Sequence, residues 1–291
     1  MRKAMAKCRH PRITCLMLVL ASGHAYAQEN ASSPFASTNN TDLRYQFFAL
    51  DGSDLSENEE EDTGTGSDQV AHENASNPLA AVNNTDFRYQ FLDLDGSDRS
   101  DFWVDGSYML TPKLKIKYEL HYWETDVTGS SESDFESFHL KPIYFPTQGE
   151  WGSWKYKLAV GAEWIVGFGN EDEGIGTGSD QIAPLVGLAF VKGDTVLVPL
   201  VQHFQSYDGP DVSTTAFRLI AIQSLPKDFW GKLDAIVPIE WKNGNAVPAT
   251  AEVQLGKMFS PSFGVYVDGL IGIGGDRPYD WGVGVGVRFN Y

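Results

Sequence analysis

Apolar residues alternate with small or polar residues along the last segment of the chain, residues 281–291. Side chains of a β-strand point alternately to its two faces, so this pattern predicts a strand with one apolar face. The apolar face consists of Trp281, Val283, Val285, Val287, Phe289 and Tyr291. An aromatic residue at each end of such a face is typical of strands that cross a bilayer between two aromatic girdles. The segment therefore predicts a membrane-spanning strand.

The same alternation recurs from Asn84 onward and predicts twelve strands. Their approximate ranges are 85–94, 101–111, 113–124, 134–145, 153–166, 182–191, 194–205, 213–224, 230–242, 246–257, 262–273 and 281–291. A tilted strand needs about nine to eleven residues to cross a bilayer, whereas a typical strand of a soluble protein has about five or six. The predicted fold is an all-β, antiparallel, up-and-down transmembrane β-barrel.

The connections between the predicted strands differ between the two ends of this barrel. Those that follow odd-numbered strands are mostly long or acidic, as at residues 167–181, with the short 243–245 as an exception. Those that follow even-numbered strands are mostly tighter, as at residues 146–152 and 192–193. Short turns at one end and longer loops at the other are the outer-membrane arrangement, in which both termini lie in the periplasm.

Prolines inside the predicted strands argue against a barrel. They are Pro142, Pro184, Pro199, Pro238 and Pro248. Each removes a hydrogen-bond donor from the ladder, and a closed barrel has no edge strand where the loss is harmless. We expect β-bulges to absorb them. A soluble all-β sandwich is the alternative fold, and the strand lengths and the loop asymmetry favour the barrel over it.

The amino-terminal residues 1–27 have the features of a secretory signal peptide. Basic residues precede an apolar stretch at residues 13–21, and Ala-Tyr-Ala at residues 25–27 provides a cleavage site. The apolar stretch is too short for a membrane-spanning helix, which needs about 18 to 20 such residues. Cys8 and Cys15 both lie in this segment, so we expect no disulfide and no thiolate site in the mature chain.

Residues 28–83 are expected to form a separate, acidic and disordered segment before the barrel at residues 84–291. Residues 29–54 match residues 73–98 at 19 of 26 positions. The acidic, Gly-rich stretch between the two copies cannot bury enough apolar surface to become ordered. The second copy runs into the first predicted strand. The first copy is redundant for the barrel, and we interpret it as a tail, with a plug as the alternative.

Several diffuse, Gly-rich motifs lie in the second half of the chain. They are residues 176–184 (GTGSDQIAP), 200–204 (LVQHF), 209–212 (GPDV), 255–257 (LGK) and 281–289 (WGVGVGVRF). In these motifs the chain resembles the outer-membrane channel family associated with the meta-pathway of phenol degradation, over about the last 120 residues. The resemblance implies a channel-like barrel for small solutes, aromatic or apolar compounds among them. The acidic, repeated amino terminus departs from the family's pattern.

The polar faces of the predicted strands carry the candidate lumen-lining residues. They are Lys113, Lys115, Lys117, Glu119, His121, Lys155, Lys157, Glu163, Arg218, Asp234, Glu240, Glu252 and Arg288. In one interpretation these opposite charges pair and fill a narrow interior, which describes a structural or surface-interaction barrel. In the other they line a constricted pore whose charge rings select solutes. The leading hypothesis is the passive transport of a small solute, and both interpretations stay open.

A hydrolase would need a nucleophile and a base. The histidines beyond the signal peptide are His72, His121, His139 and His203, and the chain contains no G-x-S-x-G elbow. No motif resembles the outer-membrane phospholipase or lipid A acylase families. We therefore expect no catalytic residues. A lipid-modifying enzyme is the least favoured alternative, and it would require a serine within hydrogen-bond reach of one of the last three histidines.

No metal ion or cofactor is expected, and nucleic acid is not an expected partner. Residues 93–98 resemble the opening of a calcium loop, but Asp98 stands where the loop needs Gly and Val104 where it needs Glu. Removal of the signal peptide, which has five basic and no acidic residues, changes the formal charge from −17 to −22 and argues against nucleic acid. The expected partners are outer-membrane lipids and lipopolysaccharide, a small solute, and the barrel-assembly machinery, which would recognise the last strand through Phe289 and Tyr291.

Overall fold

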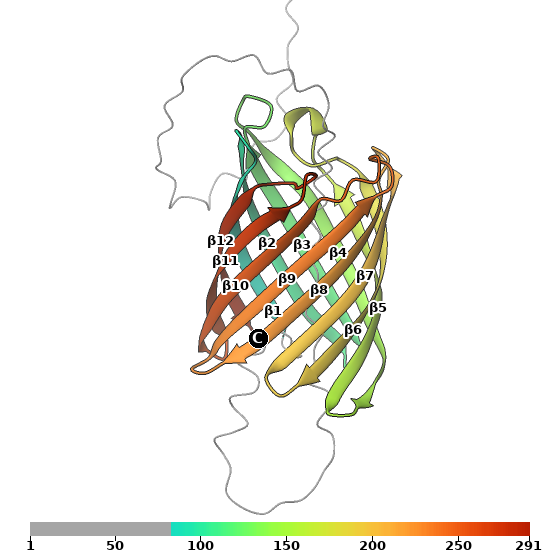
Figure 1. The fold of residues 1–291 in the computed structure, drawn as a ribbon, viewed down its shortest axis with the longest axis vertical. Coiled ribbons are helices and arrows are strands. Elements are labelled where there is room, and N and C mark those ends of the chain that lie inside the picture. Colours follow the sequence, from blue (N-terminus) through green and yellow to red (C-terminus); the bar gives the residue numbers. More distant parts are fainter. Residues whose placement is uncertain (1–82) are drawn as a thin grey trace, which may run out of the picture. The chain divides into compact units, whose positions relative to one another are not determined.

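The computed structural model describes residues 83–291, which form a closed barrel of twelve antiparallel strands (Figure 1). The strands are β1 (Asn84–Asp93), β2 (Asp98–Thr111), β3 (Leu114–Thr125), β4 (Glu132–Trp151), β5 (Trp154–Gly167), β6 (Asp180–Lys192), β7 (Thr195–Asp208), β8 (Ser213–Leu225), β9 (Phe229–Glu240), β10 (Ala249–Ser260), β11 (Phe263–Ile273) and β12 (Trp281–Asn290). Each strand pairs with the next in sequence, and β1 pairs with β12 to close the ring. The predicted fold class is confirmed. The predicted signal peptide and the first repeat copy lie outside the described residues.

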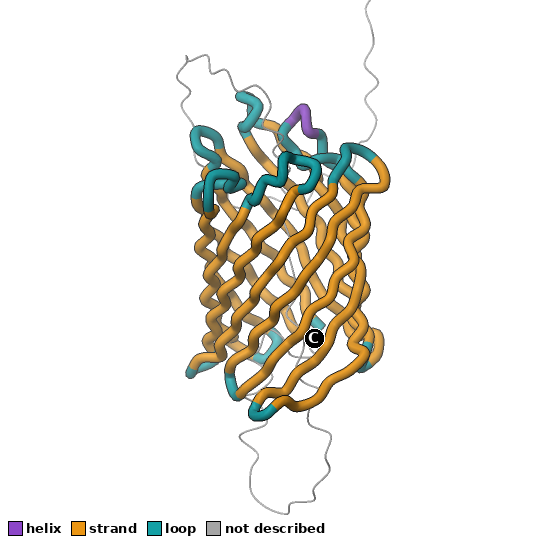
Figure 2. The backbone as a smooth tube through the Cα atoms, turned by 45° about the vertical axis from the view of Figure 1, so that its right-hand side comes forward, coloured by secondary structure: helices purple, strands orange, loops and turns teal. Residues whose placement is uncertain are grey.

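The two ends of the barrel carry different connections (Figure 2). The end that holds Asn84 and Asn290, here called the terminal end, has the connections that follow even-numbered strands. The opposite end, here called the loop end, has the connections that follow odd-numbered strands. The β5–β6 connection at the loop end contains a short 3-10 helix, η2 (Glu171–Glu173). Asn170 caps this helix by accepting a hydrogen bond from the amide nitrogen of Asp172 at 3.1 Å.

An insertion in η2 tests the predicted orientation of the barrel. No residue of η2 is buried, so a short epitope inserted after Asp172 should leave the folded barrel intact and be detected by antibody on whole cells. The same epitope inserted at Gly193, in the β6–β7 turn at the terminal end, should stay undetected until the outer membrane is permeabilised. Detection at Gly193 and not at η2 on whole cells would reverse the orientation.

Strand β4 is longer than the sequence pattern predicts. The expected turn at residues 146–152 is mostly strand, because β4 continues to pair with β5 as far as Trp151, opposite Trp154. A register shift between Tyr144 and Thr147 accommodates the proline that suggested a turn. The chain reverses instead at Gly152, whose positive φ of 64° suits glycine.

The β9–β10 connection is longer than predicted. β9 ends at Glu240 and β10 begins at Ala249, so the loop extends well beyond the expected residues 243–245. Local hydrogen bonds hold this loop, including one from the Asn243 amide to the Glu240 carbonyl oxygen at 3.1 Å. Pro248 therefore lies in the loop and removes no hydrogen bond from the sheet.

Three of the other prolines face outward and interrupt one seam each without a bulge. Pro184 and Pro199 are exposed, and the β6–β7 pairing omits the residue pairs around them while the register on either side stays the same. Pro142 interrupts the β4–β5 pairing in the same way. The opposite seam of each strand remains paired. The expected bulges at these prolines are therefore wrong, because each proline lacks only one donor and affects only one neighbouring strand.

The outer face of the barrel is apolar. In β12, Trp281, Val283, Val285 and Phe289 are 42–51% exposed, whereas the glycines between them face inward. Exposed large apolar residues occur on eleven of the twelve strands of the described barrel, and on β3 the outward apolar residues are half-buried. An apolar band of this kind around a closed barrel is the surface that a bilayer covers. No helix within residues 83–291 is long and apolar enough to cross a membrane.

Candidate functional site: the inner face of the barrel

The inner face of the barrel carries most of the predicted lumen-lining residues. Those on the inner face are Lys115, Lys117, Glu119, His121, Lys155, Lys157, Glu163, Arg218, Asp234, Glu240, Glu252 and Arg288. Lys113 is different, because β3 begins one residue later than predicted, at Leu114. Its side chain is exposed in the turn before β3.

Arg88 of β1 is the centre of the first charged network. Its guanidinium donates through Nε to Asp268 Oδ2 at 2.8 Å and through Nη2 to Glu252 Oε2 at 2.6 Å. The second Glu252 oxygen lies 2.8 Å from Lys232 Nζ. The guanidinium also lies over the Trp103 ring, 4.7 Å from its centroid. Arg88 and Asp268 are absent from the predicted set, although period-2 alternation within their strands places both on the inner face.

A second pair closes the seam between the first and last strands. Arg288 of β12 donates to both carboxylate oxygens of Asp86 on β1, at 2.7–3.0 Å. The hydroxyl of Tyr266, from β11, donates to Asp86 Oδ2 at 3.2 Å. Because this pair joins residues from the two ends of the barrel sequence, it stabilises the closed ring and not a local hairpin.

Glycines in β12 make room for these contacts. A Cβ atom at Gly286 would overlap the Tyr266 ring, and one at Gly284 would lie 2.8 Å from Asp268 Oδ2. The side chains of β1 and β11 can therefore lie across the inner face of β12, and Arg88 reaches β10 over two intervening strands. The Gly-Val alternation thus provides an apolar outer face and a flat inner face on one strand.

Arg218 of β8 and Asp234 of β9 form a bidentate ion pair. Arg218 Nε donates to Asp234 Oδ1 at 2.5 Å, and Nη2 donates to Oδ2. Each side chain is only 4% exposed. Lys232 lies 3.8 Å from the same carboxylate and connects it to Glu252 of the Arg88 network.

A second network lies on β3, β4, β5 and β7. Glu163 is its centre: its Oε1 contacts His139 Nδ1 at 2.7 Å, and its Oε2 contacts Lys141 Nζ at 2.8 Å and Gln202 Nε2 at 2.7 Å. The His139 ring packs against the His121 ring at 5.3 Å between centroids. His121 Nε2 in turn lies 3.4 Å from a Glu119 oxygen.

The remaining predicted residues lie nearer the ends of the barrel. Glu240 is at the loop end, where it accepts a hydrogen bond from Asn243 Nδ2 at 2.8 Å. Lys155 and Lys157 are near the terminal end, and Lys157 Nζ lies 4.2 Å from the centroid of the Phe145 ring. These residues flank the charged networks.

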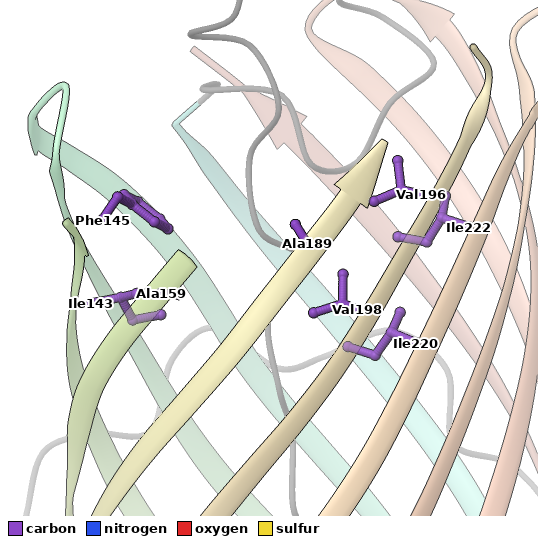
Figure 3. Close-up of a cluster of buried hydrophobic side chains, with 8 residues drawn as sticks. All are labelled: Ile143, Phe145, Ala159, Ala189, Val196, Val198, Ile220 and Ile222. Carbon is purple, nitrogen blue, oxygen red and sulfur yellow. The ribbon is translucent and has the colours of Figure 1, made fainter. Parts of the chain in front are cut away.

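The inner face of β4 to β8 also carries an apolar cluster toward the terminal end (Figure 3). Its members are Ile143, Phe145, Ala159, Ala189, Val196, Val198, Ile220 and Ile222, all at most 3% exposed. A second cluster toward the loop end contains Ile165, Ala183, Phe204, Val212 and Ala216. The inner face of β8 to β12 and β1, here called the charged arc, therefore carries the Arg88 and Arg218 networks, whereas the inner face of β4 to β8 combines two apolar clusters with the Glu163 network.

The charged side chains pair along the wall of the barrel. Every ion pair described above joins residues on the same strand or on strands at most three places apart in the ring. The longest reach is from Arg88 on β1 to Glu252 on β10. In these pairs, each charge is balanced by a partner on a nearby strand. None of these pairs extends across the interior to the opposite side of the barrel.

One serine lies within hydrogen-bond reach of a predicted histidine. Ser137 Oγ is 2.7 Å from His139 Nε2, and His139 Nδ1 is 2.7 Å from Glu163 Oε1. These are the atom pairs of a Ser-His-acid triad. However, the Ser137 hydroxyl also donates to the Glu136 carboxylate, and Ser137 is only 1% exposed. A hydroxyl has one proton, so while it donates to Glu136 it cannot give that proton to His139.

Metal ligands do not gather in the described part of the chain. Within residues 83–291, no group of three or more His, Cys, Asp or Glu side chains is arranged to hold a metal ion. Residues 93–98, which resemble a calcium loop, form the tight connection between β1 and β2, where Leu94 donates to the Ser97 carbonyl oxygen at 2.9 Å.

Comparisons with known proteins agree with this architecture. No family model and no curated protein matches the chain. The solved structure of the NanC porin is similar, with a TM-score of 0.55 at 10% identity, covering 71% of this chain and 100% of the porin. An outer membrane channel from Pseudomonas putida F1 has a TM-score of 0.53 at 10% identity, covering 72% of this chain and 96% of its own. At this identity the likeness shows the fold alone.

The closed antiparallel barrel and its apolar outer band define an outer-membrane β-barrel. Within this class, the chain shares its fold with a porin and an outer membrane channel. The fold that the resemblance in the carboxy-terminal motifs implied is therefore confirmed.

Proposed function

We propose that the protein is a passive channel for small solutes in the outer membrane of a Gram-negative bacterium. The observation that carries this proposal is the pairing of inward charges along the wall, from Arg88 to Glu252 and from Lys141 to Glu163. Charges that are satisfied beside the wall can form rings around a permeation path. The fold, shared with a porin and a channel, supports the same function.

The class of solute follows from the two arcs of the inner face. The clusters around Phe145 and Phe204 make the inner face of β4 to β8 more apolar, while Arg88, Arg218 and Arg288 lie on the charged arc. A solute with an apolar or aromatic body would contact one arc and keep its polar groups on the other. This agrees with the small aromatic or apolar compounds that the family resemblance implies.

Replacement of Lys117 tests whether the inner face controls ion passage. Its Nζ is 3.9 Å from Asp105 Oδ2, near the upper limit for an ion pair, so Lys117→Gln should fold normally. The anion-to-cation permeability ratio in a planar bilayer should fall about fourfold, since a unit charge roughly 10 Å away in water contributes about 0.4 kcal/mol, with opposite sign for a monovalent anion and a monovalent cation. Lys113→Gln, in the exposed turn before β3, is the matched control and should leave the ratio nearly unchanged.

The alternative is a structural or surface-interaction barrel with a packed interior. It predicts no single-channel conductance for the parent protein, together with a Lys117→Gln variant that unfolds at a lower urea concentration. That pair of results would reject the channel. Contacts with lipopolysaccharide and with the assembly machinery through Phe289 and Tyr291 remain predictions under either function.

A hydrolase is the second candidate, and Ser137, His139 and Glu163 are the observation that favours it. Its substrate class would be small acyl esters. If these residues were catalytic, Ser137→Ala should reduce hydrolysis of p-nitrophenyl butyrate by the purified barrel at least about 1,000-fold. We propose the non-enzymatic function because the Ser137 proton is held by Glu136. We therefore expect Ser137→Ala and the parent to show the same background rate.

A further inference from the structure

The amino-terminal repeat contains a second copy of the first barrel strand. Residues 29–54 match residues 73–98 at 19 of 26 positions, and β1 lies within the second copy at residues 84–93. The aligned segment of the first copy is residues 40–49, NTDLRYQFFA against NTDFRYQFLD in β1. Neither the channel function nor the barrel requires this duplication.

Ion pairs between inward-facing side chains hold β1 between β12 and β2. Asp86 pairs with Arg288 at 2.7 Å, and Arg88 pairs with Glu252 and Asp268 at 2.6–2.7 Å. These partners lie on β10, β11 and β12. A replacement strand must therefore present an acid and an arginine at the same spacing and on the same face.

The first copy meets these requirements. Asp42, Arg44 and Gln46 occupy the positions that correspond to the inward Asp86, Arg88 and Gln90. On the outward face, Thr41, Leu43, Tyr45 and Phe47 correspond to Thr85, Phe87, Tyr89 and Phe91. Both the charges that face the barrel interior and the apolar side chains that face lipid are thus retained in the first copy.

We propose that residues 40–49 are an alternative β1, which can occupy the place between β12 and β2 instead of residues 84–93. The barrel would then exist in two strand-exchanged forms with the same ion pairs. In the exchanged form, Asp42 binds Arg288, and Arg44 binds Glu252 and Asp268.

The exchange moves the acidic segment between the two copies to the other end of the barrel. With residues 84–93 in place, the segment between the copies, residues 55–72, precedes β1 in the chain, and β1 begins at the terminal end. With residues 40–49 in place, residues 55–72 become part of the connection to β2 at the loop end. That connection is only residues 94–97 in the structure described here. The two forms therefore expose the same segment on opposite sides of the membrane.

Packing favours the second copy. Leu92 is completely buried, and its Cδ2 atom lies within 2.5 Å of where a Gly282 Cβ would be. The first copy has the larger Phe48 at this position. Because closely packed sites accept added volume poorly, residues 84–93 should fill the site in most molecules of the parent protein.

The test uses a substitution that disfavours residues 84–93 as β1. It then measures on which side of the membrane the acidic segment lies. Arg88→Glu would place an acid against Glu252 and Asp268, so the first copy should replace the second. With Ser67→Cys as the only cysteine of the mature chain, a membrane-impermeant maleimide should label whole cells at least tenfold more in the Arg88→Glu variant than in the parent. Asp172→Cys and Gly193→Cys mark the loop end and the terminal end in parallel.

Arg44→Glu is the matched control, because it makes the same charge change at the corresponding position of the first copy. It should fold and leave Ser67→Cys unlabelled. Arg88→Glu in a protein that lacks residues 29–72 should lose the heat-modifiable folded form. Equal labelling of the two glutamate variants, or loss of the folded form in full-length Arg88→Glu, would overturn the proposal. So would labelling accompanied by a covalent dimer after amine cross-linking, since the strand would then come from a second molecule.

Discussion

Asp234→Ala is expected to lower the free energy of unfolding of the barrel by about 3–5 kcal/mol, the usual cost of removing one partner of a buried ion pair. Asp234 accepts both hydrogen bonds of a bidentate pair with Arg218, and the two side chains are each only 4% exposed. Its removal leaves a guanidinium inside the barrel without the carboxylate that offsets its desolvation. Urea titration of the refolded protein in liposomes, followed by tryptophan fluorescence, measures the change.

Two controls separate ion pairing from other effects of the substitution. The exposed pair of Lys242 and Asp211, 2.9 Å apart and more than half exposed, should contribute at most about 1 kcal/mol, so Asp211→Ala should have little effect. The double variant Arg218→Leu/Asp234→Leu should recover most of the loss, because apolar replacement of a whole buried pair is often neutral. Equal losses in Asp234→Ala and Asp211→Ala would mean that the Arg218 pair is hydrated.

Much of the fold follows from period-2 alternation. The twelve strands and their approximate bounds could be predicted because lipid and interior select opposite side chains at successive positions, as in β12. The β4–β5 turn could not be predicted, because proline and glycine at residues 146–149 indicate a turn while a register shift lets the strand continue. Local composition has no information about the partner strand that keeps such a segment extended.

The sequence predicts which residues face the interior, but it does not predict which of them pair with one another. Alternation along β3 places Lys115, Lys117, Glu119 and His121 on one face, and the structure agrees. The partners could not be predicted, because Arg88 reaches Glu252 only after the barrel has closed and brought β1 next to β12. In sequence these two residues are 164 positions apart.

The networks also explain the Gly-Val pattern at the end of the chain. As a lipid-facing strand, β12 requires only the valines and aromatic residues of its outer face. The inward glycines have a separate reason, since the side chains of Tyr266, Asp268 and Gln90 lie where their Cβ atoms would be. The strand that closes the barrel is therefore also the surface on which the interior charges are arranged.

Gly286→Ala should accordingly destabilise the barrel by about 1–3 kcal/mol, the range for added volume in a closely packed interior. The new Cβ would overlap the ring of Tyr266, which is 2% exposed and donates to Asp86 at 3.2 Å. Gly269→Ala is the matched control on β11, because a Cβ there meets nothing within 4 Å. Its free energy of unfolding should differ from that of the parent by less than about 0.5 kcal/mol.

A double-mutant cycle identifies the cause of the loss. If the overlap with Tyr266 is responsible, Gly286→Ala should cost much less in a Tyr266→Ala background, with an interaction energy of about 0.5–3 kcal/mol between the two positions. The same urea titration applies to all four proteins of the cycle. Additive effects would place the strain elsewhere, and a Gly269→Ala variant as unstable as Gly286→Ala would show that any side chain on these glycine positions is harmful. In either case the inner face of β12 would not be the surface that positions the Asp86, Arg88 and Arg288 contacts.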